Sequence, residues 1–462
     1  MTAVDQVRPP AVRLAPAPVV AVCLRSGVGV REVEHGLEIA TPAWASEVRV
    51  RSGAVRAAFL RLDSPTEPGR LLTGAADGDR LAGAVEAQVL LAKLAAVGVL
   101  DHVVLVEGRE LARLTAEGSM PVRLPERRTD PGLPRALSRH AVLQVHEGWV
   151  RAESGRSHLR VRFAPRLLTT LAGPDWSELP EPFVRMLETA ALVDPVGEPP
   201  PPVHWSAAEL WFHRLSAESR SVDRYGGTYP TGRRRAPAFS RPPPPREASL
   251  DLPEPDLDAR RHTDAPLVSV MESRRSVREF DPSRVPTREQ VGELLFRSCR
   301  VRRTFQDGHG LEVVDRPYPS GGAIHELEVY LVVADVSGVP AGIWRYAADR
   351  HALDRVAEAG AAAYRQLVQD AQATGGLSRR PPVTLVITSR FDRLMFKYET
   401  LAYALTLKNT GVLMQTLYLN ATAIGLGACA LGGCSTSLLA AATGTDPLVE
   451  GTVGMMTLGV PR

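Results

Sequence analysis

Residues 317–333 read PYPSGGAIHELEVYLVV, a turn-forming segment that leads directly into an apolar run. Glycines have no Cβ atom, so a pair of them lets backbone N–H groups approach a planar ligand closely. An ordinary turn needs one glycine, whereas Gly321 and Gly322 follow Ser320 as a pair. This segment therefore predicts a ligand-contacting loop in front of a buried strand.

Around this segment the chain alternates helices and strands from about residue 263. The apolar spacing predicts helices over residues 269–277, 288–299, 356–374 and 437–444, and a long helix over roughly Lys397 to Ile424. Buried strands are expected over residues 327–335, 382–391 and 453–460. The C-terminal half is therefore predicted to be an α+β domain with one core.

The N-terminal half shows a weak internal duplication. Its first part predicts strands over 19–25, 37–41, 47–52 and 55–62, a helix over 84–100 and a strand over 101–107. Its second part predicts strands over 140–148, 149–155 and 158–164 and helices over 166–173 and 183–193. The repeated order outlines winged-helix-like units, and two generic α+β lobes would fit the spacing equally well.

A proline-rich segment separates the two halves. Thirteen of the 38 prolines lie between Pro195 and Pro255, and such clusters favour extended backbone without hydrogen-bond donors. We therefore expect two winged-helix-like units over residues 1–195, a linker or connector over 196–262, and the α+β domain over 263–462. The connector carries several aromatic and charged residues, which favours docking on a neighbouring surface.

Composition excludes several classes of protein. The 55 basic and 52 acidic residues nearly cancel, so the chain lacks the positive field of a general nucleic-acid binder. No signal peptide or membrane span is expected, because the uncharged stretch 409–445 contains too many polar residues and glycines. Four cysteines in a chain of this length favour a reducing, cytoplasmic setting, and Cys429 and Cys434 lack further metal ligands nearby. We expect buried cysteines and no metal site.

Lysine is almost absent, and its positions are therefore informative. Only Lys93, Lys397 and Lys408 are lysines among the 55 basic residues. Arginine stays protonated, whereas a lysine amine can accept a proton when its surroundings favour the neutral form. A surface lysine beside a packing tyrosine is the ordinary explanation for the pair Lys397 and Tyr398. The scarcity of lysine favours an acid–base role instead.

Two further segments could hold a ligand. SRRSVREF (273–280) places several guanidinium groups near each other, which suits phosphate and carbonyl oxygens, although a solvated basic face explains it as well. GLGACALGG (425–433) follows a helix, and its glycine spacing differs from the dinucleotide-binding fingerprint between a strand and a helix. A nicotinamide-binding Rossmann fold is therefore excluded, and a flavin or no cofactor remains.

Taken in order, RRSVR, PSGGAIHELEVY, FKY and QTLYLNATAIGLGACALGG resemble the azoline dehydrogenases of the nitroreductase superfamily, also called SagB-type or McbC-like dehydrogenases. The resemblance covers residues 263–462. It implies a nitroreductase-like fold, bound FMN, and oxidation of thiazoline or oxazoline rings to thiazoles or oxazoles in ribosomally made, modified peptides. It also implies a homodimer with FMN at the interface, a precursor peptide and cyclodehydratase subunits as partners, and no nucleic acid or membrane.

The resemblance also assigns residues. Lys397 and Tyr398 match the catalytic Lys-Tyr pair that removes the ring proton. Arg274, Arg275, Ser276 and Arg278 would hold the FMN phosphate and pyrimidine oxygens. Residues Ser320, Gly321 and Gly322 would contact the isoalloxazine from the partner subunit, and Leu431 and Gly432 would offer backbone amides near its reactive edge.

The chain departs from the family within the predicted long helix. Many relatives have an acidic residue and a Gly-His pair where this chain has Lys408, Asn409, Gly411 and Val412. On one uninterrupted helix Lys397 and Lys408 would share a face, so Lys408 or Asn409 is expected to contact FMN or lower the pKa of Lys397. Arg462 is expected to add a phosphate contact.

Two other functions fit the same residues. One is a general nitroreductase or flavin reductase that uses NAD(P)H and small substrates, which needs neither the Lys-Tyr pair nor the long N-terminal half. The other is a non-catalytic scaffold that binds a leader peptide and organises a synthetase.

Overall fold

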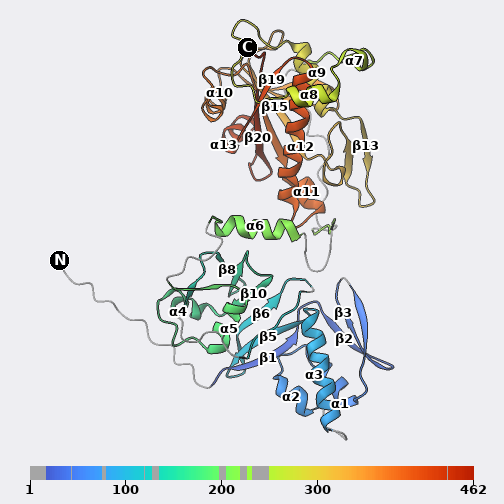
Figure 1. Cartoon of the computed structure of the whole chain (residues 1–462), viewed down its shortest axis with the longest axis vertical. Coiled ribbons are helices and arrows are strands. Elements are labelled where there is room, and N and C mark those ends of the chain that lie inside the picture. Colours follow the sequence, from blue (N-terminus) through green and yellow to red (C-terminus); the bar gives the residue numbers. More distant parts are fainter. Residues whose placement is uncertain are drawn as a thin grey trace, which may run out of the picture. The chain divides into compact units, whose positions relative to one another are not determined.

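The computed structural model describes residues 17–42, 44–74, 80–118, 120–126, 135–196, 204–218, 226–230, 249–433 and 435–462. The chain divides into two compact units, Met1–Gly226 and Gly227–Arg462 (Figure 1). Their boundary falls inside the proline-rich segment. Each unit is described by itself below.

A small sheet and three helices form the first part of unit 1. The strands are β2 (Gly29–Val33), β3 (Gly36–Ala40) and β4 (Ala45–Arg49), and the helices are α1 (Gly53–Phe59), α2 (Pro68–Gly74) and α3 (Arg80–Ala96). The strand expected over residues 55–62 is wrong. Val55, Phe59 and Leu62 recur at helical spacing and are buried together, and the Val55 N–H donates to the Ser52 side chain, which caps α1.

A six-stranded antiparallel sheet forms the rest of unit 1. Its spatial order is β1 (Val19–Leu24), β5 (Leu100–Val106), β6 (Arg109–Ala116), β10 (Leu159–Phe163), β9 (Trp149–Ser154) and β8 (Ala141–His146). Each of the two similar sequence segments contributes three strands to it, and β6 pairs with β10 at their junction. The helices α4 (Leu168–Ala172), preceded by the 3₁₀ turn η1 (Pro165–Leu167), and α5 (Glu181–Thr189) share its core, and β7 (Arg135–Leu137) pairs with β11 (Val193–Pro195).

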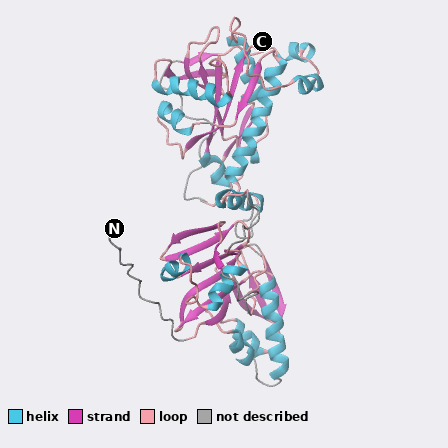
Figure 2. Cartoon of the chain, turned by 60° about the vertical axis from the view of Figure 1, so that its left-hand side comes forward, coloured by secondary structure: helices cyan, strands magenta, loops and turns pink. Residues whose placement is uncertain are grey.

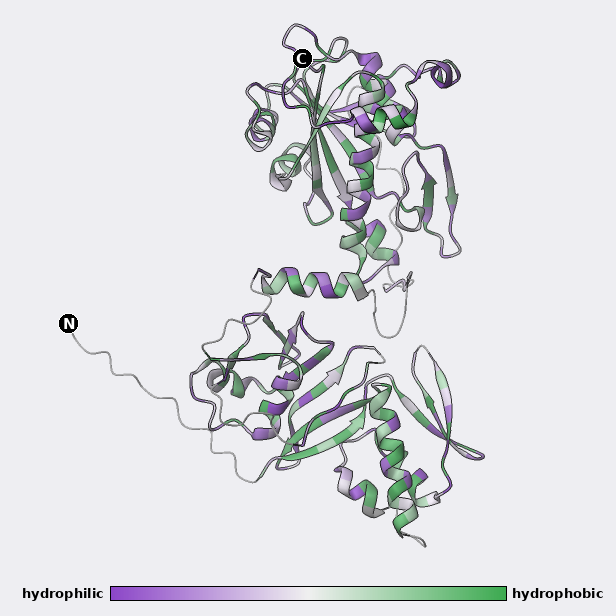
Figure 3. Ribbon diagram, in the orientation of Figure 1, coloured by the Kyte–Doolittle hydropathy of each residue, from purple (hydrophilic) through white to green (hydrophobic). Residues whose placement is uncertain are grey.

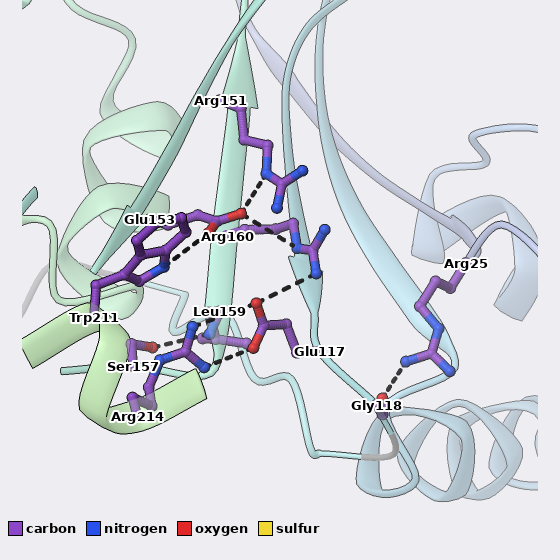
Figure 4. Close-up of polar contacts among 10 residues, drawn as sticks. All are labelled: Arg25, Glu117, Gly118, Arg151, Glu153, Ser157, Leu159, Arg160, Trp211 and Arg214. Atoms are coloured by element: carbon purple, nitrogen blue, oxygen red, sulfur yellow. Dashed lines mark hydrogen bonds and ion pairs between the residues drawn. The ribbon is translucent and has the colours of Figure 1, made fainter. Parts of the chain in front are cut away.

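Helix α6 (Ala207–Glu218) belongs to the connector and packs on unit 1. Its Arg214 guanidinium donates to the Glu117 carboxylate at 2.6 Å, and its Trp211 Nε1 donates to Glu153 Oε2 at 3.2 Å (Figure 4). Arg160 also bonds Glu117, so the carboxylate is shared between the helix and β10. Helix α6 therefore docks through charged and aromatic side chains, the residue types that favoured docking in the sequence.

Unit 2 is built on a seven-stranded antiparallel sheet covered by helices (Figure 2). Its spatial order is β12 (Ser249–Asp251), β17 (Ala352–Glu358), β16 (Gly342–Ala347), β15 (Leu327–Val333), β18 (Val383–Arg390), β20 (Glu450–Gly459) and β19 (Gly427–Leu431). All seven residues of β15 are buried. The antiparallel sheet is therefore buried on both faces, and β15 reads as a continuous apolar run interrupted only by Glu328.

Alternate residues of the central strand pack against different helices. Val329 and Leu331 share a core with α9 (Arg288–Cys299) and α12 (Ala402–Ala423). Tyr330 and Val332 share the opposite core with α10 (Ala362–Gly375) and α13 (Thr436–Thr443). The helices α7 (Leu257–Thr263), α8 (Leu267–Ser273) and α11 (Phe391–Lys397), the 3₁₀ turn η3 (Gly321–Ala323) and the hairpin β13 (Arg303–Gln306) and β14 (Glu312–Asp315) complete the unit.

The α+β prediction for this unit is confirmed, with three local corrections. The helix expected over residues 269–277 is α8, which ends at Ser273. Residues 356–358 belong to strand β17 and the following helix begins at Ala362, so the helix expected from 356 is too long. The long helix expected from Lys397 is also wrong, because α11 ends at Lys397 and α12 begins at Ala402. Cys23, Cys299 and Cys429 are buried, as expected, and Cys434 lies outside the described residues.

Candidate active site

The loop after Pro319 is fixed by a buried residue of α12. The Gly321 N–H donates to Asn409 Oδ1 at 3.2 Å, and Asn409 Nδ2 donates to Ser320 Oγ at 3.1 Å and to Glu326 Oε1 at 3.0 Å. Burial raises the pKa of Glu326, and the hydrogen bonds from Asn409 and Ser320 partly offset this. Asn409 therefore orders the loop that the sequence singled out.

The same loop brings Gly322 against the two predicted catalytic residues. Gly322 has φ +64°, and a Cβ atom built on it would lie 2.7 Å from the Tyr398 hydroxyl and 3.1 Å from Lys397 Nζ. Ala323 and His325 also have positive φ, which costs free energy at residues with a side chain. A strained loop thus presents glycine backbone to an amine and a hydroxyl.

Lys397 and Tyr398 lie at the end of a short helix, and the expected position at the start of a long one is wrong. Tyr398 is extended, with φ −116° and ψ 145°, and its N–H closes α11 by donating to Leu394 O at 2.8 Å. The Tyr229 N–H donates to Lys397 O at 3.1 Å and so satisfies a carbonyl at the helix end. Lys397 and Lys408 therefore share no continuous helix, and Lys408 is exposed on α12.

Two residues that the sequence analysis missed contact this pair. Asp307, in the turn of the β13–β14 hairpin, has Oδ2 3.8 Å from Lys397 Nζ and accepts a hydrogen bond from the Tyr229 hydroxyl at 2.9 Å. Lys397 Nζ also lies 5.9 Å from the ring centroids of Tyr229 and Tyr398. A turn signal at Asp307–Gly310 was visible in the sequence, but nothing in it indicated proximity to Lys397.

Further along α12 lies the other group of predicted ligand residues. The Arg274 guanidinium lies 5.2 Å from the ring centroid of Tyr418, and the Ser276 and Tyr418 hydroxyls are 3.0 Å apart. The Ala430 N–H donates to the Tyr418 hydroxyl at 2.6 Å, and Ser276 bridges to Ala428 in β19. The segment after α8 is thus attached to α12 and β19 together.

Arg278 and Arg462 line one cavity of about 490 Å³. Arg379, Arg380 and Gln372 also line it, together with Glu279 and other residues. The Arg462 N–H donates to Glu279 O at 3.4 Å. This hydrogen bond attaches the residues after β20 to the segment that contains Arg278. The fold therefore brings together two guanidinium groups that are 184 positions apart.

The remaining predicted ligand residues lie on the same two segments as Arg274 and Ala430. Arg275 and Gly432 are exposed, and Leu431 is buried at the end of β19. Among the described residues there is no cluster of side chains that could hold a metal ion, and no helix there is long and apolar enough to cross a membrane.

Comparison with known proteins identifies relatives of the second unit. Residues 271–460 match the model described as the nitroreductase family. The Methanocaldococcus jannaschii protein MJ1384, which carries a nitroreductase name, is 29% identical over 40% of this chain and 84% of its own length. The trifolitoxin-processing protein TfxB of Rhizobium leguminosarum is 30% identical over 30% of this chain and 38% of its own.

The microcin B17-processing protein McbC of Escherichia coli is 36% identical over 24% of this chain and 42% of its own length. The chain thus spans less than half the length of TfxB and McbC. A solved structure of the Escherichia coli microcin synthetase McbBCD complex with truncated pro-MccB17 matches 44% of this chain and 73% of the other, at 24% identity and a TM-score of 0.35.

Proposed function

We propose, on the premise that residues 271–460 form a nitroreductase-family domain of the McbC-like kind, that this protein is an FMN-dependent dehydrogenase that oxidises azoline rings in a modified peptide. The observation that carries the proposal is the convergence of the Lys397 amine and the Tyr398 hydroxyl on Gly322. A small-molecule reductase needs no such pair, whereas removal of a ring proton does.

The donor set fits FMN. Arg278 and Arg462 supply guanidinium groups to one cavity, which suits a phosphate, and Arg274 and Ser276 supply donors beside Tyr418 and Ala428. Arg275 and the amides near Leu431 would add contacts. When bound, FMN would supply the hydride acceptor for the oxidation.

The chain's own residues would handle the proton. Burial raises the pKa of Tyr398 above its ordinary value near 10, so its hydroxyl keeps its proton at neutral pH and can donate a hydrogen bond to the ring. Lys397, in its neutral form, would then take the proton from the ring carbon next to the peptide carbonyl. The Gly321 and Gly322 backbone, ordered by Asn409, would position the planar ring against this pair.

A homodimer would complete the site. Asn409 and Tyr418 lie nine residues apart on α12, which at ~1.5 Å per residue separates the Gly322 group from the Arg274 group by roughly 14 Å along the helix. Apolar side chains are exposed on α12 and on the neighbouring α8, namely Tyr403, Leu407, Val412, Leu267, Val268 and Met271. We propose that these faces meet in the dimer, so that each flavin is held by Arg274 of one subunit and by the loop of the other.

Unit 1 would bind the precursor peptide or the cyclodehydratase. An open groove of about 890 Å³ lies between α1 and α3. The ribbon of α3 is coloured mostly as hydrophobic (Figure 3), and its Leu81, Val85 and Val89 are exposed at helical spacing. TfxB and McbC process peptides according to their names, which supports a peptide substrate here.

The test is to purify the protein, identify its flavin and incubate it with an azoline-bearing peptide. Loss of two hydrogens per ring, abolished in Lys397→Ala and Tyr398→Phe and retained in the control Lys93→Ala, is expected. Bound FMN with NAD(P)H consumption but no change in peptide mass would instead identify a general reductase. A colourless protein whose pathway still functions with Lys397→Ala would identify a scaffold.

A further inference from the structure

The Asp307 carboxylate accepts three hydrogen bonds, from two backbone N–H groups of its turn and from a distant tyrosine. Its Oδ1 accepts hydrogen bonds from the backbone N–H groups of His309 at 2.9 Å and Leu311 at 3.0 Å, and its Oδ2 accepts from the Tyr229 hydroxyl. Although burial opposes it, these hydrogen bonds hold the pKa of Asp307 below its ordinary value. The turn therefore holds an ionised carboxylate in a fixed position near the Lys397 amine.

Tyr229 is held by contacts with His309, Phe396 and Asp307. Its ring stacks on His309 with centroids 3.8 Å apart and meets Phe396 edge-on at 5.9 Å. Burial, together with the hydrogen bond to Asp307, raises the pKa of Tyr229 to about 12, so its hydroxyl remains a donor. Tyr229 thus fixes both the backbone of Lys397, through its own N–H, and the carboxylate that faces the Lys397 amine.

Gly227 packs closely against the Lys397 side chain, with no space for a side chain of its own. A Cβ atom on Gly227 would lie 3.1 Å from Lys397 Cγ and 3.2 Å from Cε. The segment from Gly227 to Tyr229 therefore lies along the Lys397 side chain, which is only 18% exposed, and limits the positions of its amine.

We propose that Asp307 and Tyr229 are positioning residues for Lys397. The Asp307 carboxylate holds the Lys397 amine beside Gly322 and stabilises the ammonium that forms when the amine accepts a proton, and the Tyr229 hydroxyl holds that carboxylate. This is the arrangement in which a third group orients a base and stabilises its protonated form. The groups that face Lys397 are Asp307 and Tyr229, with Tyr398 and Glu399 following on its own segment and His309 behind Tyr229.

The inference rests on the proposed function only for its catalytic consequence, so the primary test needs no turnover. The purified flavoprotein is treated with a trace of acetic anhydride, and acetylation of its three lysines is quantified by peptide mass spectrometry. Only neutral amines react, and a nearby carboxylate favours the ammonium form. Lys93 and Lys408, both exposed, serve as internal references in each sample.

At pH 7, Asp307→Asn is expected to speed acetylation of Lys397 relative to Lys408 by about threefold to tenfold. The difference should disappear near pH 11, where most lysine amines are neutral. Tyr229→Phe should give a smaller increase at pH 7, because it keeps the ring and loses the hydrogen bond. The matched control is Asp315→Asn, which removes a carboxylate from the same hairpin where it pairs with Arg302 and Arg303.

The proposal would be overturned if Asp307→Asn left the ratio of Lys397 to Lys408 acetylation unchanged at pH 7. An equal increase of this ratio at pH 7 and pH 11 would also overturn it, because such an increase reports only greater exposure of the Lys397 side chain. If the wild-type protein oxidises azolines, Asp307→Asn should also lower kcat by about tenfold at high pH, where most lysine amines are neutral in both proteins, with little change in KM, and Asp307→Glu should recover part of it. If the wild-type protein oxidises none, the acetylation result still decides whether Asp307 positions Lys397.

Discussion

At the scale of single residues, Gly322 has little freedom to change. It combines φ +64° with the close approach of the Tyr398 hydroxyl and the Lys397 amine. Both constraints arise from the same loop, whose hydrogen bonds to Asn409 keep it from relaxing away. A side chain here would have to displace the groups that we propose to carry the proton transfer.

Gly322→Ala is therefore expected to lower turnover by about tenfold or more, while costing about 1 kcal/mol of stability from the positive φ. The measurements are ring oxidation by mass spectrometry and the thermal unfolding temperature. Gly360→Ala is the control, since a Cβ atom there meets nothing within 4 Å. Equal activity of the two variants would contradict the crowding argument.

His325 predicts a pH dependence of stability for the same loop. Burial lowers the pKa of His325 to about 3, from an ordinary value near 6.5. Between these values the unfolded chain binds a proton that the folded chain does not, so this residue makes stability fall as pH falls from about 6.5 toward 3. The full loss of stability is reached only below the folded-state pKa of about 3.

We expect His325→Asn, which tolerates positive φ, to reduce the loss of stability between pH 7 and pH 5 relative to wild type, by up to about 1.4 kcal/mol per pH unit below 6.5. Thermal unfolding of the transition that includes unit 2, followed at both pH values, measures it. The exposed His35 provides the control His35→Asn. Parallel pH profiles for wild type and His325→Asn would count against burial of a neutral imidazole.

At the scale of elements, the sequence predicts what local signals determine. Helix α9 spans the expected residues 288–299 because Thr287 and Gln290 form a capping box. The break between α11 and α12 has no such signal, since residues 398–401 contain neither glycine nor proline. It is imposed from outside, by the Tyr229 N–H at the end of α11 and by the packing of Tyr398 beside Gly322.

The same distinction explains which site residues the sequence indicated. Lys397, Tyr398 and the Ser320–Gly322 loop stand out by residue type and spacing. Asp307 lies at a turn signal and Tyr229 in the connector, 78 positions apart, and only the tertiary structure joins them. Contacts of this kind carry no periodicity that a single sequence could show.

The exposed face of α12 predicts the effect of a charge on assembly. Leu407 is 41% exposed, beside Lys408 and near Tyr403. If this face forms the dimer interface, Leu407→Glu buries an unpaired charge there and should convert the dimer to a monomer that retains less flavin. Sedimentation velocity and the flavin absorbance ratio measure both effects, and Leu448→Glu, at a more exposed leucine of the same unit, is the control.

At the scale of the whole molecule, the position of the two residue groups predicts how subunits share a site. If Arg274 of one subunit and Lys397 of the other serve the same flavin, the variants Arg274→Ala and Lys397→Ala are each inactive alone. A mixed dimer of the two then contains one site with both residues intact and one site with neither. If both residues served the flavin of their own subunit, every site in the mixed dimer would lack one of them.

Co-expression of the two variants under different affinity tags, followed by tandem purification of the mixed dimer, should therefore recover about half of the wild-type azoline oxidation per dimer. Mixing two preparations of Lys397→Ala controls for the tags and should recover none. An inactive mixed dimer with normal flavin content would show that each site is built from one chain. The roughly 14 Å between the groups along α12 would then have to be spanned by the ligand itself.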